Sequence, residues 1–108
     1  MVTIQKTGAS YYLVSVNHNM EELSRTECTH LKHELSQVMK PHREISINLK
    51  GKKSINPEGF RILQELGRMA EKRNCKIRYI NVDPSINVKI TKLSERKIQY
   101  HDEFGNAG

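Results

Sequence analysis

Residues 52–60 contain the side chains whose types and order most clearly suggest a chemistry. Asn56 is a helix-capping residue, Pro57 suits the first position of a helix, and Glu58 places an acid near the positive end of the helix dipole. Helix N-termini attract anions, and Lys52 and Lys53 precede this one, so we expect contacts either to a small anion or to a protein partner. The residues predicted to form the partner contacts are Ser54, Asn56, Pro57, Glu58, Gly59 and Phe60.

Phe60 allows two interpretations. At about 100° per residue, it lies about 120° round the helix from the centre of the apolar stripe. Its ring is therefore either packed under the preceding loop or partly exposed as an anchor for a partner.

The cysteines and histidines raise metal binding as an alternative. Cys28, His30 and His33 are close in sequence, and Cys75 and His101 could join them. However, Cys28 belongs to an apolar stripe, the two histidines point to the opposite side of the helix, and no CxxC or HExxH spacing is present. We therefore predict two buried, reduced thiols and no metal.

Catalysis and nucleic-acid binding have less support. The chain has no glycine-rich phosphate loop, nucleophile elbow or paired-carboxylate motif, so we expect neither enzyme activity nor a cofactor. Lys50, Lys52, Lys53 and Arg43 could contact phosphates, as the net charge of +6 allows. The chain has only four tyrosines, two phenylalanines and no tryptophan, which argues against specific binding of nucleic acid. A basic nucleic-acid-binding module is therefore kept as an alternative only.

Alternating strands and helices must position these residues. Residues 2–5 and 11–16 predict a hairpin. The capping box from Ser24 to Glu27 then opens a helix whose apolar stripe is Cys28, Leu31, Leu35 and Val38, and Pro41 is expected to end it. Residues 45–49 alternate as a strand with one buried face.

The second half continues the alternation of helices and strands. A polar loop at 50–54 leads into the helix that starts at Asn56, and Asn74 is expected to stop that helix in the left-handed conformation. Residues 75–79 alternate as a strand, and Asp83-Pro84-Ser85 opens a short helix carrying Ile86, Ile90 and Leu93. Ile98 and Tyr100 suggest a final edge strand, with a tail at 101–108.

The resulting order, β-β-α-β-α-β-α, predicts an α/β fold with a mixed sheet and helices packed on one face. At 108 residues the chain is expected to be a single domain, 1–108. It has no apolar run long enough to span a membrane, and only two cysteines, so we expect a reducing, cytoplasmic location.

Three segments carry a family pattern: ISINLKG, SINPEGFRILQELGRMAEKRN and CKIRYINVDPSI. Together they resemble the STAS domain of anti-sigma factor antagonists and sulfate-transporter tails. The family's Asp-Ser-Ser-Gly-Leu falls on Asn56-Pro57-Glu58-Gly59-Phe60, so Pro57 stands where antagonists present the serine that a kinase phosphorylates. Ser54 is the nearest substitute acceptor.

This resemblance implies a non-catalytic bacterial regulatory domain acting in signalling or transcription regulation. It would bind an anti-sigma factor or kinase, as a monomer or weak dimer, without phosphorylation at the usual position. Two alternatives stay open: a STAS-type subunit of a transporter or signalling complex, and a module for nucleic acid or for a small anion or nucleotide.

Overall fold

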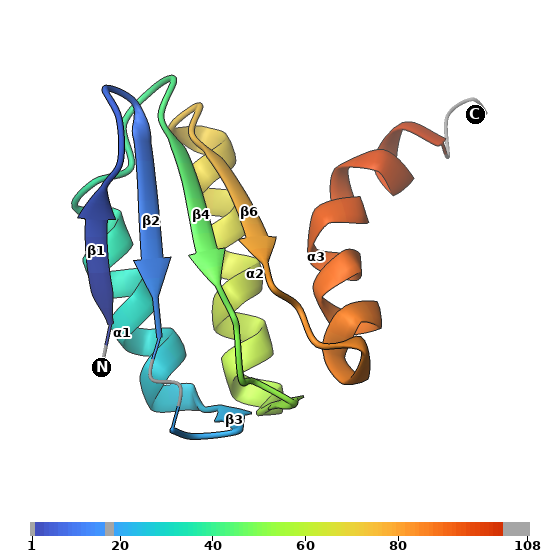
Figure 1. Ribbon diagram of the computed structural model, residues 1–108. Helices are drawn as coiled ribbons and strands as arrows, with labels where there is room; N and C mark the ends of the chain where they lie inside the picture. Colours follow the sequence, from blue (N-terminus) through green and yellow to red (C-terminus); the bar gives the residue numbers. More distant parts are fainter. Residues whose placement is uncertain (1, 17–18, 103–108) are drawn as a thin grey trace.

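The computed structural model describes residues 2–16 and 19–102, with side chains described up to residue 93. Strands and helices alternate along the chain (Figure 1). The elements are β1 (Thr3–Lys6), β2 (Tyr11–Ser15), β3 (Glu22–Leu23), α1 (Arg25–Ser36), β4 (Glu44–Asn48), β5 (Ser54–Ile55), α2 (Pro57–Lys72), β6 (Lys76–Ile80) and α3 (Pro84–Asp102). The predicted order is confirmed for the main elements, and the sequence missed the short strands β3 and β5.

The main sheet has the strand order β1-β2-β4-β6. β1 pairs antiparallel with β2, whereas β2 with β4 and β4 with β6 are parallel pairs. Their register aligns apolar side chains across the sheet in two rows, one of Tyr12, Ile45 and Ile77 and the other of Val14, Ile47 and Tyr79. The predicted mixed sheet is therefore confirmed.

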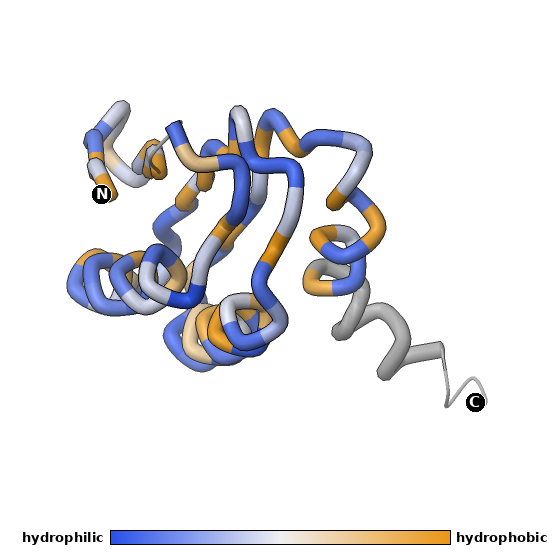
Figure 2. Tube along the Cα trace, turned by 90° about the horizontal axis from the view of Figure 1, so that it is seen from below, coloured by the Kyte–Doolittle hydropathy of each residue, from blue (hydrophilic) through white to orange (hydrophobic). Residues whose placement is uncertain are grey.

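Helices α1 and α2 cover one face of the sheet and leave the other open (Figures 1 and 2). The core lies between this helical layer and the sheet, where Leu31, Leu35 and Leu66 are fully buried. The first part of α3 lies beyond β6, where buried Ile86 and Ile90 anchor it. Among the described residues, no helix is both long and apolar enough to cross a membrane.

Helix α1 begins as predicted but ends earlier. The Ser24 hydroxyl accepts a hydrogen bond from the Glu27 amide at 3.1 Å, which is the first half of the capping box. The second half is wrong, because the Glu27 side chain turns into the core toward Lys52 instead. The helix ends at Ser36, before Pro41, and the following turn brings Met39 into the core at 4% exposure.

Helix α2 follows its sequence signals at both ends. Asn56 Oδ1 accepts hydrogen bonds from the amides of Glu58 at 2.9 Å and Gly59 at 3.2 Å, and Pro57 occupies the first turn. The helix buries Gly59, Leu63, Leu66 and Ala70. Asn74 has a φ of 56°, the predicted left-handed stop.

The prediction for the C-terminal segment was wrong. Residues 84–102 form one continuous helix, so the short third helix extends through the positions of Ile98 and Tyr100, which form no edge strand. No glycine or proline lies between residues 85 and 102 to interrupt the helix. The predicted tail begins two residues too early, and its remainder, 103–108, lies outside the described residues.

Candidate functional site

The predicted contact segment lies at the carboxyl ends of the parallel strands, where open α/β sheets commonly place their binding sites. Here β5 pairs in parallel with β3, below the main sheet in Figure 1. The Lys53 amide donates to the Glu21 carbonyl at 2.7 Å, and the Asn56 amide donates to the Leu23 carbonyl at 3.0 Å. The segment expected to be a polar loop is thus bound by backbone hydrogen bonds to the chain before α1.

Lys52 differs most from the sequence expectation. Its side chain is 0% exposed, and its ammonium lies 2.7 Å from Glu27 Oε1. The same nitrogen donates to the carbonyls of Met20 at 2.8 Å and Glu22 at 3.3 Å. All three ammonium protons are therefore used inside the protein, so Lys52 is not available for the predicted contact to an external anion.

Lys53 does lie on the surface, but it is directed toward the start of α3. Its ammonium is 3.9 Å from Asp83 Oδ2, and its carbonyl lies 2.8 Å from the Ser85 hydroxyl. Hydrogen bonds from Ser85, with a smaller effect of the Lys53 charge, lower the pKa of the Asp83 carboxyl. The two lysines therefore do not act as a pair beside the N-terminus of α2.

The exposed groups around the start of α2 come from several segments. Ser54 and Pro57 are exposed, and Glu58 forms an exposed ion pair with Arg25 of α1 at 3.7 Å. Phe60 is half-buried and packs against the core. Its environment is therefore intermediate between the two predicted alternatives, a ring packed under the loop and a partly exposed anchor. Met20 is 54% exposed, and its carbonyl accepts a hydrogen bond from Lys52. Sequence reasoning missed Met20 because it belongs to no periodic apolar pattern.

Gly59 lies at the point where α2 approaches the first turn of α1. A Cβ atom there would lie 3.0 Å from Cys28 Sγ and 3.3 Å from the Ser24 carbonyl. Burial, with a smaller effect of the Glu27 charge, raises the pKa of the Cys28 thiol to about 12. Cys28 is therefore a neutral packing group, and the missing side chain of Gly59 allows α1 and α2 to approach closely.

Among the residues whose side chains are described, the cysteines and histidines considered for metal binding are not brought together. Within residues 2–16 and 19–93, no three His, Cys, Asp or Glu side chains form a group that could hold an ion. Cys28 and Cys75 are buried, whereas His30 and His33 are exposed on α1. The side chain of His101 lies outside the described residues.

The basic residues considered for nucleic-acid binding do not form one cluster either. Arg43 precedes β4, at the end of the sheet opposite to residues 50–53 (Figure 1). Its guanidinium donates to the Val38 carbonyl at 3.0 Å and lies 5.0 Å from the centre of the Tyr12 ring. Since Lys52 is buried as well, the predicted basic group is divided.

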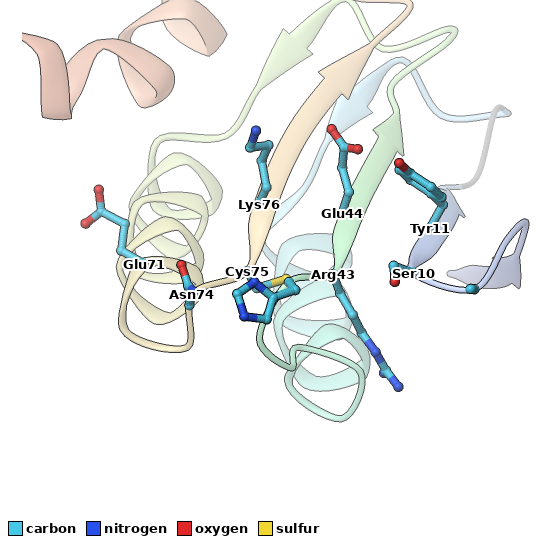
Figure 3. Close-up of a pocket in the computed structure, with 10 residues that line it drawn as sticks. Ser10, Tyr11, Arg43, Glu44, Glu71, Asn74, Cys75 and Lys76 are labelled. Atoms are coloured by element: carbon cyan, nitrogen blue, oxygen red, sulfur yellow. The ribbon is translucent and has the colours of Figure 1, made fainter.

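A cavity of about 560 Å³ lies at that opposite end, beside the N-terminal ends of β2, β4 and β6. Figure 3 shows Tyr11, Glu44 and Lys76 on these neighbouring strands, with the side chain of Arg43 directed away from theirs. Burial raises the pKa of the Cys75 thiol in its wall, so this cysteine is no activated nucleophile. Sequence reasoning missed this cavity, whose nearest signal was Asn74.

Comparison with solved structures shows the fold. The anti-sigma factor antagonist SpoIIAA in its unphosphorylated form matches with a TM-score of 0.64 at 10% identity, over 94% of this chain and 99% of that one. The phosphorylated form of SpoIIAA, a Bacillus cell fate determinant, matches with a TM-score of 0.60 at 11% identity, over 94% and 84%. The predicted STAS fold is therefore confirmed.

A larger protein contains a similar unit. The murine anion transporter Slc26a9 matches with a TM-score of 0.63 at 14% identity, over 80% of this chain. This chain spans only 14% of the transporter's length. Comparison with protein-family models gives no match, and comparison with curated proteins gives none either.

Proposed function

We propose that this chain is a non-catalytic regulatory domain of the bacterial cytoplasm that binds a protein partner. Its contact surface is Met20, Arg25, Ser54, Asn56, Pro57, Glu58 and Phe60, whereas Gly59, predicted to belong to it, is buried against α1. One observation carries the proposal: exposed side chains of α1 and α2 meet at the capped N-terminus of α2, on a fold shared with an anti-sigma factor antagonist. The partner class that this likeness favours is an anti-sigma factor or its kinase.

The chemistry of the contact surface favours surface complementarity. Phe60 is an aromatic group only partly used by the core, and Met20 is a flexible apolar group that is more than half exposed. Arg25 and Glu58 supply both charges beside them, 3.7 Å apart. A small apolar centre with charged groups around it is the usual composition of a protein interface.

A covalent phosphate switch at the family position is not part of this proposal. Pro57 has no hydroxyl, and Glu58 carries one negative charge where a phosphoserine carries about two. Ser54 has the only hydroxyl between residues 52 and 60. After incubation with a cognate kinase, mass spectrometry should find no phosphate in this segment, and stoichiometric phosphate on Ser54 would contradict the proposal.

The match to Slc26a9 favours a second candidate, in which the same domain serves as a subunit of a transporter or signalling assembly. The contact surface would be the same, but the partner would be a membrane protein or its complex. Identification of the partner separates the two candidates.

The test is a photo-cross-linking amino acid placed at position 58 and, as a control, at position 71 near the other end of α2. Position 58 should cross-link one partner protein in cells, and position 71 should not. Equal cross-linking from both positions, or from position 71 alone, would contradict the proposed surface.

A further inference from the structure

Lys52 connects segments that are distant in sequence. Its ammonium lies within 2.8 Å of the Met20 carbonyl, 3.3 Å of the Glu22 carbonyl and 2.7 Å of Glu27 Oε1. These partners belong to the segment before α1 and to the first turn of α1 itself. Lys52 lies between β4 and β5, so a single cation joins both segments to the strand that leads into α2.

Glu27 depends on this lysine. Its side chain is 9% exposed, and Oε1 is bonded to Lys52, while Oε2 has no hydrogen-bond partner among the described residues. Burying a carboxylate that has one partner carries a large desolvation cost. Replacing such an ion pair by apolar groups is often neutral for overall stability. The pair is therefore poorly explained as a source of stability alone.

We propose that Lys52 is a positioning residue, an internal cation that holds the contact surface in its binding geometry before the partner arrives. The inference rests on the proposed function for its purpose. Met20 and Ser54, at the edge of that surface, are carried by the two segments that the ammonium joins. A surface fixed in this way loses less conformational entropy when it binds.

The test uses Glu27→Met with Lys52→Met, a double variant that removes both charges and leaves neither one unpaired. Amide hydrogen exchange is measured at Lys53 and Asn56, whose N–H groups bond to Glu21 and Leu23 across the joined segments. We expect exchange there about tenfold faster or more, with Ile47 in β4 unchanged and the melting temperature close to that of the wild type. Lys53→Met, which removes an exposed neighbouring ammonium, should leave exchange at Asn56 unchanged.

Wild-type protection at Lys53 and Asn56 in the folded double variant would overturn the inference. A double variant that fails to fold would also overturn it, because the pair would then be stabilising the whole domain. Neither result involves a partner, so each is distinct from failure of the cross-linking test at position 58.

Discussion

At the scale of single residues, burial separates Lys52 from Lys53. Lys52 is 0% exposed and paired with Glu27, whereas the side chain of Lys53 is 59% exposed. Lys52→Met should lower the free energy of unfolding by about 3–5 kcal/mol, because it leaves a buried carboxylate without its cation. Lys53→Met should change it by less than about 1 kcal/mol, as is usual for an exposed ion pair. Urea denaturation of both variants checks this, and equal effects would show that the burial argument is wrong.

The Cys28 thiol predicts how stability changes in alkaline solution. Its pKa rises from 9.0 to about 12 on burial, so the folded protein keeps the proton that the unfolded chain releases. The thiol's contribution is therefore complete below pH 9 and is lost as the pH rises toward 12. Denaturation midpoints for Cys28→Ala should fall less steeply than those of the wild type across that range. Parallel curves would contradict the assigned burial of the thiol.

The residue types alone did not predict the roles of Lys52 and Glu27. Glu27 was expected to complete a capping box and Lys52 to face solvent, and both expectations follow from local rules. Their contact joins positions 25 residues apart, in segments that are linked by the parallel β3–β5 pair. The helix cap at Asn56 was predictable because the Glu58 and Gly59 amides that its side chain binds lie within three residues.

At the scale of elements, the crossing of α1 and α2 depends on a missing side chain. A Cβ atom at Gly59 would meet Cys28 Sγ at 3.0 Å, with backbone carbonyls close behind. Gly59→Ala should therefore destabilise the protein by about 1–3 kcal/mol through overpacking. Gly67 lies on the same helix with nothing within 4 Å of its Cβ position, so Gly67→Ala should stabilise by about 0.5–1 kcal/mol. Melting temperatures of the two variants should move in opposite directions.

Regular periodicity explains which elements could be predicted. The strand at Ile45 and Ile47 alternates clearly, and α2 has a cap, an apolar stripe and a left-handed stop. β3 and β5 have only two residues each, which is too short for any pattern. The alternation of Ile98 and Tyr100 was also too short, and the uninterrupted helix from Pro84 overrode it.

At the scale of the whole molecule, three of the basic residues considered for phosphate contact are separated from one another or turned to other roles. Lys52 is buried, Arg43 packs on Tyr12 at the opposite end, and Lys53 lies near Asp83. Nucleic-acid binding should therefore be sequence-independent, with dissociation constants above about 1 μM at physiological salt. Fluorescence anisotropy with defined RNA and DNA oligonucleotides checks this. Submicromolar affinity for one sequence would favour the nucleic-acid alternative.

The fold was predictable at this scale, whereas the cavity was not. Alternating elements and the predicted one-faced strand dictate a sheet with helices on one side, and the STAS pattern covered the same segments. The cavity beside Tyr11, Glu44 and Lys76 forms where three strands begin, and no local pattern encodes that meeting point.

The central claim is that the start of α2 is where a protein partner binds. Its most direct test is the affinity of the cross-linked partner, once purified, for Glu58→Arg and for Glu71→Arg, the same reversal at opposite ends of one helix. Because Glu58 is 62% exposed, the first change should leave the fold intact and weaken binding about tenfold or more, while the second should bind like the wild type. Wild-type affinity in Glu58→Arg, or an equal loss in both variants, would contradict the account.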